Sequence, residues 1–457
     1  MQTNTGINVD RFTSKHGLVY LSTCLLVYLF IGLQYATLTP AWQVPDEPAH
    51  YNVIKHIAQT GSLPVMEKGD YDQERLGKIV SAGFPSDQSV DFIHYQDYQP
   101  QLYYLLATPI YLLFNGALLP LRIFSLLLGA GVIIFAYLAV SEATCHAQSP
   151  REASNLQPLI SIAFIAFIPQ HIAMMAGVNN DSLSELIIAI GLWQILRVSR
   201  SGFGFWALFL LSVVIGVAFI TKVQAYILAP LVLLMLILHR RTQNLKLNIQ
   251  NLLIVFIPAL LIGSLYWGRN LAIYGFPDFV VGIRHDQVVL GQPRTSEWIA
   301  QYGALEVTQR FFQTTFQSFW GQFGWMGVVM DQRVYIALMI FSALLIIGFV
   351  IAVRHPQSAI PNLQSLISNP QSLILFVSAL LTLALYLYYN LTYVQHQGRY
   401  LFPALIPISV AVSLSLTTWA NLFTFLGDKR KWFAFVPITM MAALCGFALY
   451  RFIIPAL

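Results

Sequence analysis

The chain has 457 residues, of which 57% are hydrophobic and 10% are charged, and its mean hydropathy is +0.64. A soluble domain carries charge on roughly 25% of its residues, so this composition excludes a soluble protein and indicates a polytopic membrane protein. The formal net charge of +5 does not indicate a nucleic-acid partner, because basic residues of membrane proteins gather on one face for topological reasons. Cys24, Cys145 and Cys445 have no metal-binding or Cys-x-x-Cys spacing, which indicates neither a zinc site nor a disulfide framework.

Apolar segments long enough to cross a bilayer, which takes ~20 residues of helix, recur along the whole chain. They are 16–37, 120–140, 158–177, 182–196, 204–221, 225–238, 250–267, 334–353, 371–389, 401–419 and 432–450. A twelfth candidate, 102–117, is short and broken by Pro109, so we expect it to lie along the surface or to re-enter. The pattern predicts an all-α polytopic membrane protein with about 11 transmembrane helices in one integral membrane domain, 1–457.

The placement of basic residues favours this count. Short cytoplasmic loops are enriched in Lys and Arg, and with eleven spans the clusters Arg11/Lys15, Arg197/Arg200, Arg240/Arg241/Lys246 and Lys429/Arg430/Lys431 all share one side. If 102–117 crossed the membrane, Arg11 and Lys15 would lie opposite every later cluster. Two large extracytoplasmic loops follow from this map: 38–119, with juxtamembrane helices, and 268–333.

The first of these loops opens with two adjacent carboxylates, Asp46 and Glu47, followed by Pro48 and His50. Proline suits the first turn of a helix, and the positive end of the helix dipole keeps nearby carboxylates ionised. His50 follows Asp46 by four residues, so one helical face could present Asp46, Glu47 and His50 together. Such carboxylates can act as a general base or hold a cation. The alternative interpretation is a helix cap on a solvated juxtamembrane helix.

Further charged residues lie at the outer ends of predicted spans. Asp181 lies at the mouth between two spans, where a carboxylate is costly unless it is paired or solvated; it could equally be the N-cap of the next helix. Arg122, Lys222, Arg269 and Arg399 also face the outer side. Arginine suits phosphate, because its planar donors match phosphate oxygens. The alternative for each basic residue is an interfacial anchor with its head group in the interface.

Aromatic residues are frequent in the outer loops, among them Tyr95, Tyr98, Tyr103, Tyr104 and the run Phe319-Trp320-Gly321-Gln322-Phe323-Gly324-Trp325. Stacking on sugar faces is one use of such residues, and an interfacial aromatic belt is the commoner one. His171, His285 and His396 lack ligand spacing, and we expect them to serve packing or hydrogen bonding.

Taken in order, these residues resemble the GT-C glycosyltransferases, polytopic enzymes that use a polyprenyl-phosphate-linked sugar donor. The matching elements are Asp46-Glu47, Gln99-Pro100-Gln101-Leu102-Tyr103-Tyr104, Arg122 and Asn180-Asp181-Ser182-Leu183. More narrowly, Tyr266-Trp267-Gly268-Arg269-Asn270, Ser318-Phe319-Trp320-Gly321 and Gln397-Gly398-Arg399-Tyr400-Leu401-Phe402-Pro403 resemble a group of bacterial membrane proteins related to protein mannosyltransferases. The family usually has two prolines before Leu-Tyr-Tyr, where this chain has Pro100-Gln101.

The resemblance implies an inverting sugar transfer at the extracytoplasmic face of the bacterial inner (plasma) membrane. Asp46 would be the base that deprotonates the acceptor hydroxyl, with Glu47 as its alternative or partner. Asp181 would orient the acceptor or help hold a divalent cation, for which Asp46, Glu47 and Asp181 are the candidate ligands. Arg122, Arg269 and Arg399 would stabilise the leaving polyprenyl phosphate, and His50 and Lys222 would contact substrate.

Two other functions remain open from the residues alone. A transporter or flippase for a lipid-linked sugar would also need outer-face charges, although transporters often show two related halves with polar residues near mid-membrane, which we do not find in this sequence. A structural subunit would tolerate replacement of Asp46 and Asp181. The acceptor could be a protein, a glycolipid or a polysaccharide, and the loops do not distinguish among these classes.

Overall fold

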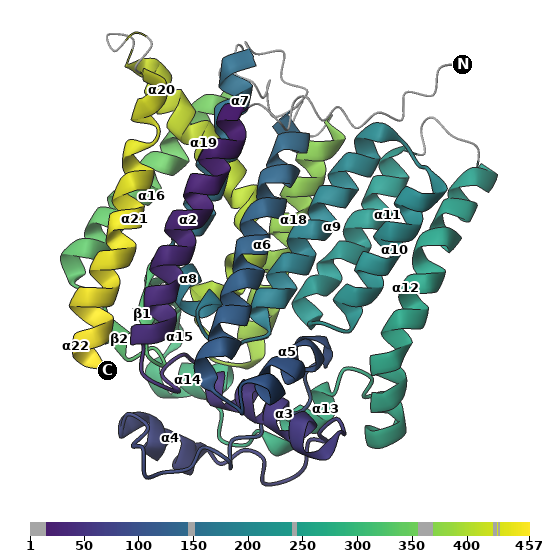
Figure 1. The fold of residues 1–457 in the computed structure, drawn as a ribbon, viewed down its shortest axis with the longest axis vertical. Coiled ribbons are helices and arrows are strands. Elements are labelled where there is room, and N and C mark those ends of the chain that lie inside the picture. Colours follow the sequence, from purple (N-terminus) through teal and green to yellow (C-terminus); the bar gives the residue numbers. More distant parts are fainter. Residues whose placement is uncertain (1–14, 145–150, 240–244, 355–368, 424–426, 428–429) are drawn as a thin grey trace.

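The computed structural model describes residues 15–144, 151–239, 245–354, 369–423, 427 and 430–457. The described chain is mostly helical and has two parts (Figure 1). Long helices stand side by side in an upright bundle, and shorter elements form a layer across one end of it. We call this layer the outer layer, because it consists of the two loops for which the sequence predicts an extracytoplasmic position.

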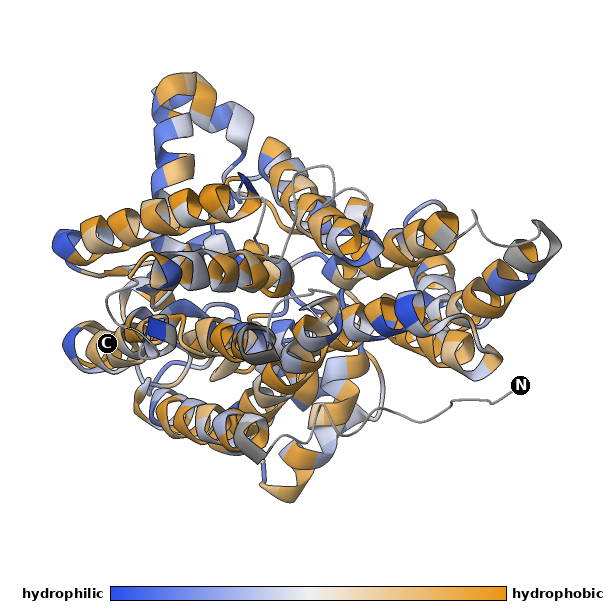
Figure 2. Cartoon of the chain, turned by 90° about the horizontal axis from the view of Figure 1, so that it is seen from above, coloured by the Kyte–Doolittle hydropathy of each residue, from blue (hydrophilic) through white to orange (hydrophobic). Residues whose placement is uncertain are grey.

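The bundle contains most of the apolar sequence. Its helices are α2 (Lys15–Leu38), α6 (Leu118–Thr144), α7 (Arg151–Ala166), α8 (Pro169–Met175), α9 (Asp181–Ser201), α10 (Phe205–Phe219), α11 (Leu228–His239), α12 (Leu245–Tyr274), α16 (Gln332–Arg354), α18 (Pro370–Thr392), α19 (Leu405–Leu422) and α21 (Val436–Ala448). Shorter helical pieces adjoin them: η1 (Val223–Ile227), η3 (Gly398–Ala404), α20 (Arg430–Phe433), η5 (Leu449–Ile453) and α22 (Ile454–Ala456). The bundle helices are hydrophobic over most of their surface (Figure 2).

Many large apolar side chains on these helices are exposed, such as Leu26 at 68%, Leu265 at 69% and Ile346 at 66%. A helix that is apolar on all sides belongs in a core or in lipid, so these exposed faces are lipid-facing surface. Their number identifies the chain as an integral membrane protein.

Among the described residues, eight helices are long and apolar enough to cross a membrane. A ninth span is possible where Leu156–Ala166 and Pro169–Met175 meet at a 67° bend, because Pro169 keeps Ile168 out of the helical conformation (ψ 117°). The expected spans 204–221 and 225–238 correspond to shorter apolar helices, Phe205–Phe219 and Val223–Leu238. Helix length therefore does not confirm the expected number of eleven, which stays a prediction.

The first outer segment, 38–119, contains α3 (Glu47–Thr60), α4 (Gln73–Ser81) and α5 (Leu102–Leu113). Helix α5 covers most of the twelfth candidate segment and lies below the bundle in Figure 1, in contact with α3. This position agrees with the expectation that 102–117 does not cross.

The second outer segment, 268–333, contains the end of α12, then α13 (Gly282–Val288), α14 (Thr295–Tyr302) and α15 (Ala304–Trp320). It closes with the antiparallel hairpin of β1 (Gln322–Phe323) and β2 (Val328–Val329). A hydrophobic cluster joins the two outer segments, since Leu76, Ile79 and Phe84 of the first pack with Val288 and Val289 of the second. The outer layer is thus one packed unit.

The ends of the described helices agree with the expected charge map. Helix α2 begins, and helices α9 and α16 end, at the end of the bundle away from the outer layer (Figure 1); these ends contain Lys15, Arg200 and Arg354. Arg11, Arg240, Arg241, Lys429 and Cys145 lie outside the described residues.

Candidate functional site

A cavity of about 600 Å³ lies where the outer layer meets the bundle. Its wall combines residues of the first outer segment, the second outer segment and the bundle. The wall includes Asp46, His50, Tyr71, Gln73, Tyr95, Gln96, Asn179, Asp181, Lys222, His285, Gln292, Trp325, Leu385, Tyr388, Tyr389, Gln395, Gln397, Arg399 and Tyr400. Of the eight expected site residues, five line this cavity.

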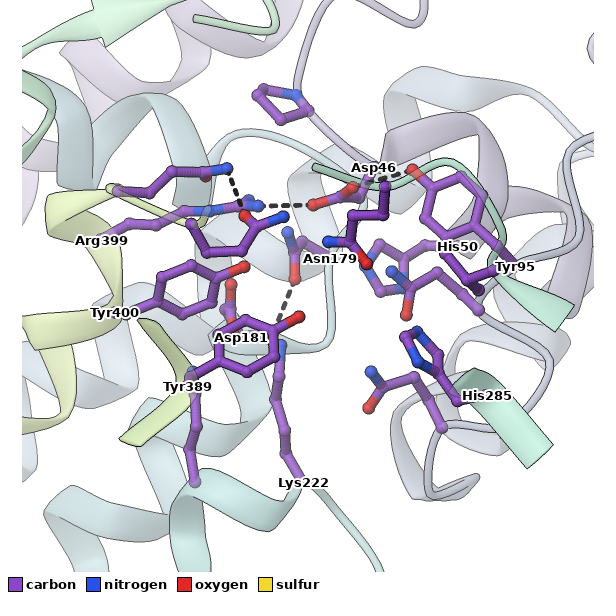
Figure 3. A pocket seen from close by; sticks show the side chains of 18 of the residues that line it. Asp46, His50, Tyr95, Asn179, Asp181, Lys222, His285, Tyr389, Arg399 and Tyr400 are labelled. Carbon is purple, nitrogen blue, oxygen red and sulfur yellow. Dashed lines mark hydrogen bonds and ion pairs between the residues drawn. The ribbon is translucent and has the colours of Figure 1, made fainter. Parts of the chain in front are cut away.

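Asp46 projects into the cavity because of an unusual backbone conformation. Its φ of 67° lies in the left-handed region, which is uncommon for a residue other than glycine and is often found at functional sites. Asp46 precedes α3 but makes no side-chain capping hydrogen bond. Its Oδ1 accepts a hydrogen bond from the Tyr95 hydroxyl (2.8 Å), and its Oδ2 accepts one from Arg399 Nη2 (2.6 Å; Figure 3). The alternative role as a helix cap is therefore not supported.

Charge and burial act in opposite directions on Asp46. Burial alone would raise the pKa of this carboxyl, but the charge of Arg399 and the hydrogen bonds from Arg399 and Tyr95 hold the pKa below its usual value. Asp46 is thus a carboxylate at neutral pH. Its side chain is 21% exposed, so a molecule in the cavity can reach it.

His50, one turn further along α3, lies beside Asp46 in the cavity and is neutral. Burial, followed by the charge of Lys222, lowers the pKa of His50 to about 3. Its Nδ1 is 2.8 Å from the Tyr104 hydroxyl. Burial also lowers the pKa of His285, across the cavity, to about 4. Both imidazoles therefore bring hydrogen-bonding capacity to the cavity without charge.

Arg399 reaches Asp46 because a glycine precedes it. A Cβ on Gly398 would lie 2.4 Å from the backbone nitrogen of Phe319, so only glycine allows η3 to pack this closely on α15. The Gly398 N–H also donates to Ser318 Oγ (2.7 Å). Nη1 of Arg399 contacts only the Met174 sulfur (3.8 Å), and its Nε has no hydrogen-bond partner among the described residues. Arg399 therefore retains donor capacity for a ligand.

A second ion pair crosses the same cavity. Asp181 is the first residue of α9, and its carboxylate accepts a hydrogen bond from Lys222 Nζ. Lys222 also donates to Asn180 Oδ1 (2.8 Å), while Asn179 Oδ1 accepts from the Asp181 N–H (2.8 Å). The Asp181 side chain thus serves the ion pair, and it faces the cavity as expected.

Glu47 and Arg122, both expected at the site, do not line the cavity and instead pair with each other. Glu47 points away from the cavity, and its two oxygens accept from Arg122 Nε (2.8 Å) and Nη2 (2.6 Å). The side chains are 0% and 4% exposed. Glu47 also accepts the backbone N–H groups of Trp42 and Val178, and Arg122 donates to the carbonyls of Ala36, Thr39 and Pro40. All five Arg122 donors are used, so the pair joins α2, α3 and α6 and has no donor left for phosphate.

Arg269 is also placed differently from the expectation. Its Nη2 donates to the carbonyls of Leu63 (3.2 Å) and Pro64 (2.5 Å) in the first outer segment. Arg269 does not line the cavity. Its observed role is to hold the first outer segment against the end of α12.

The three expected cation ligands do not come together. Glu47 is enclosed by Arg122, while Asp46 and Asp181 are each paired with a cation. Among the described residues, no group of three or more His, Cys, Asp or Glu side chains could hold a metal ion. A divalent cation therefore stays a prediction, and we assign no step to one.

Sequence reasoning missed several lining residues. Tyr389 and Tyr400 lie beside Arg399 in Figure 3, and glutamines of four different segments complete the wall. In the sequence, the only indication that these tyrosines and glutamines belong to the site was that they lie near the Gln-Gly-Arg motif or near the outer ends of spans. His285 was expected to serve packing or hydrogen bonding; it packs edge-on against Tyr98 (4.7 Å between ring centroids) and also lines the cavity. His171 and His396 are buried in hydrogen-bonding or aromatic contacts, as expected.

No family model matches this chain, and no curated protein matches its sequence. Its structure is similar to the oligosaccharyltransferase of Archaeoglobus fulgidus tethered with an acceptor peptide containing the NVT sequon, with a TM-score of 0.52 and 11% identity over 95% of this chain and 55% of that chain. The apo form of that enzyme gives a TM-score of 0.53 and 12% identity over 95% and 56% of the two chains. ArnT from Cupriavidus metallidurans bound to undecaprenyl phosphate gives a TM-score of 0.47 and 14% identity. The match covers 97% of this chain and 74% of that chain.

This chain spans about half the length of the archaeal oligosaccharyltransferase. At these identities the similarity concerns the fold alone, which this chain shares with the archaeal oligosaccharyltransferase.

Proposed function

We propose that this chain, an integral membrane protein with the GT-C fold, is an inverting glycosyltransferase that moves a sugar from a polyprenyl-phosphate donor to an acceptor hydroxyl. The observation that carries the proposal is the Asp46–Arg399 pair, an ionised carboxylate and an incompletely paired guanidinium facing one cavity at the end of a membrane bundle. A base and an anion-stabilising group are the two functions that such a transfer requires.

In the proposed reaction Asp46 is the general base. As the acceptor oxygen forms its bond to the anomeric carbon of the donor sugar, the acceptor hydroxyl proton passes to Asp46. The bond between the anomeric carbon and the phosphate oxygen breaks, and its electron pair leaves with the polyprenyl phosphate. Attack on the side opposite the leaving group inverts the configuration.

Arg399 and Lys222 would stabilise the phosphate, whose negative charge grows as the glycosidic bond breaks. The incompletely paired guanidinium of Arg399, which lines the cavity, provides donors for phosphate oxygens, and its planar geometry suits this contact. Asp181 would keep Lys222 in place and accept a hydrogen bond from a substrate hydroxyl.

Donor binding would also activate Asp46. In the described structure both Asp46 oxygens already accept hydrogen bonds. A phosphate bound at Arg399 competes with Asp46 Oδ2 for the guanidinium, and this competition frees an oxygen lone pair for the acceptor proton. The base would therefore be available mainly when a donor is present, which limits wasteful reactions.

The location of the cavity suits a lipid-linked donor. Leu385 and Tyr388 of α18 line the cavity and are 39% and 72% exposed on the bundle surface. A polyprenyl tail can lie in lipid beside α18 while its head group reaches Arg399. We place the reaction on the extracytoplasmic side of the bacterial inner membrane, because the outer layer lies opposite the basic helix ends.

The test is release of polyprenyl phosphate from a panel of polyprenyl-phosphate sugars by the purified protein in lipid nanodiscs, with neutral disaccharides or Ser/Thr-containing peptides added as acceptors of the sugar. Release by the wild type and its loss in Asp46→Asn would support the transferase. Asp87→Asn, in the exposed part of the first outer segment, is the matched control and should release the product at the wild-type rate. No release with any donor, or equal release by wild type and Asp46→Asn, would contradict the proposal and favour transport assays with the same lipids.

A further inference from the structure

We infer that the acceptor is an uncharged carbohydrate, bound on the outer side of Asp46 by a subsite made of Tyr71, Gln73, Gln96 and Trp325. The inference rests on the proposed function and adds the acceptor class, which neither the sequence nor the fold similarity indicates. We call these four residues the outer subsite.

The charged residues of the described cavity wall balance one another. The described residues of this wall include two carboxylates and two cations, and these form two pairs: Asp46 with Arg399, and Asp181 with Lys222. His50 and His285 are neutral at physiological pH. The donor phosphate requires the two cations, so the described wall offers no further cation for a phosphorylated or acidic acceptor. An uncharged acceptor fits this balance.

The rest of the cavity wall is rich in side-chain amides and aromatic rings. The glutamines that line the cavity are Gln73, Gln96, Gln99, Gln224, Gln292, Gln395 and Gln397. A side-chain amide has both donors and acceptors, which suits hydroxyl groups, because each hydroxyl also donates and accepts. Aromatic rings bury apolar surface, including the C–H faces of sugar rings. Together these groups suit polyhydroxylated ligands.

Two glutamines of the cavity wall have unused hydrogen-bonding capacity. The side-chain oxygens of Gln96 and Gln292 are buried and have no hydrogen-bond partner among the described residues. Buried polar groups are normally paired, and an unpaired one costs about 1–3 kcal/mol. Both residues line the cavity, and rotation of either side-chain amide would bring its unpaired oxygen to a sugar hydroxyl.

The backbone is strained where Trp325 meets the cavity wall. Trp325 and Met326, in the turn between β1 and β2, have φ values of 53° and 71°. Non-glycine residues in this conformation cost about 1–3 kcal/mol each and persist where the surroundings impose them. Here the Trp325 Nε1–H donates to the Trp42 carbonyl (2.8 Å), and the ring packs on Phe84 (5.7 Å between centroids). The fold thus maintains a strained turn that places an indole ring at the cavity wall.

The two substrates can occupy opposite sides of Asp46. In Figure 3, Arg399, Tyr400 and Tyr389 lie on one side of Asp46, and Tyr95 lies on the other. Tyr95 packs edge-on against Tyr71 (5.7 Å between centroids), and the Tyr71 hydroxyl donates to Gln73. The outer subsite therefore continues from the Tyr95 side of Asp46, away from the lipid-exposed residues of α18. An acceptor hydroxyl at the inner end of this subsite reaches Asp46.

A polypeptide acceptor fits this wall less well. An extended peptide must satisfy its backbone N–H and C=O groups, commonly by pairing with the edge of a sheet. The described strands β1 and β2 have two residues each and pair with each other, and none of these four residues lines the cavity.

The test is a binding measurement that does not require turnover. The protein in nanodiscs is mixed with a panel of neutral disaccharides (maltose, cellobiose, lactose and mannobiose) and, separately, with uncharged Ser/Thr-containing hexapeptides, and saturation-transfer NMR reports which probes bind. We expect binding of at least one disaccharide and of none of the peptides. Binding of the peptides alone, or of no disaccharide, would overturn the inference.

Two variants examine the outer subsite. Trp325→Gly removes the ring while leaving a residue that adopts φ 53° without strain, and we expect about tenfold weaker disaccharide binding, equal to ~1.4 kcal/mol. Gln73→Ala, at the exposed rim, should weaken binding about threefold through a lost hydrogen bond. Gln301→Ala, on the exposed face of α14, is the matched control. Wild-type affinity in both Trp325→Gly and Gln73→Ala would overturn the placement of the subsite.

The outcomes separate this inference from the proposed function. Disaccharide binding that depends on Trp325, without polyprenyl-phosphate release from any donor, would support a sugar site and contradict the transferase. Polyprenyl-phosphate release that peptides stimulate and disaccharides do not would support the transferase and overturn the carbohydrate acceptor.

Discussion

Arg399 Nη2 lies 2.6 Å from Asp46 Oδ2, although 353 residues separate the two in the chain. The pair joins the start of α3 in the outer layer to η3 at the end of α18. The pair therefore connects the first outer segment to the segment between α18 and α19. The proposed roles of Asp46 as base and of Arg399 as phosphate-stabilising group both depend on this contact.

Replacing Asp46 should abolish transfer while leaving the fold intact. Loss of a general base lowers a rate by about 10²–10⁴-fold, so we expect Asp46→Asn to reduce polyprenyl-phosphate release by that factor. The single oxygen of asparagine can still accept from Arg399 while its amide N–H donates to the Tyr95 hydroxyl oxygen, so the fold should persist. The thermal unfolding midpoint should fall, because buried Arg399 loses its counter-charge. A variant with full activity would show that another group takes the proton.

Replacing Arg399 should change both the rate and its pH dependence. We expect Arg399→Gln to lower the rate by about 10²–10³-fold, as for loss of one anion-stabilising donor. Because the charge of Arg399 lowers the pKa of Asp46, its removal raises that pKa and moves the acidic limb of the pH–rate profile to higher pH. Arg399→Lys should restore the position of this limb more fully than the rate, since lysine keeps the charge without the planar donors. An unshifted limb in Arg399→Gln would contradict the assignment of Asp46 as the titrating base.

Breaking the Glu47–Arg122 pair should destabilise the protein. Removing one partner of a buried ion pair costs about 3–5 kcal/mol, and we expect Glu47→Ala to lower the free energy of unfolding in detergent by this amount. The double variant Glu47→Leu/Arg122→Met should recover little stability, because Trp42 and Val178 lose an acceptor, and Ala36, Thr39 and Pro40 lose a donor. Recovery of wild-type stability in the double variant would show that the backbone contacts contribute little.

His50 should make the protein less stable in mild acid. Its pKa is about 3 in the folded chain and ~6.5 when unfolded, so between these values the unfolded state binds a proton that the folded state does not. Stability from this group therefore rises with pH across the window and is lost on acidification, by at most ~1.4 kcal/mol per pH unit. We expect the unfolding midpoint to fall less steeply from pH 7 to pH 4 in His50→Gln than in the wild type. Equal slopes would show that His50 is protonated in the folded state.

Properties that depend on short stretches of sequence could be predicted. Hydropathy identified the membrane class and placed α5 outside the upright bundle, and the alternation of basic and acidic segments separated the two ends of the molecule. Asp46, His50, Asp181, Lys222 and Arg399 were all expected at the outer ends of spans, and all line the cavity. Each of them lies at or near the end of a helix, where chain direction and charge limit the possible positions.

The tertiary structure alone decided which charged residues face the cavity. Asp46 and Glu47 are neighbours of the same chemical class, yet the left-handed conformation of Asp46 points its side chain into the cavity while Glu47 turns toward Arg122. Arg122, Arg269 and Arg399 are three arginines at span ends, and only Arg399 lines the cavity. The physical reason is that hydropathy and charge are local properties of the chain, whereas the partner of a buried charge is chosen by segments that fold back from hundreds of residues away.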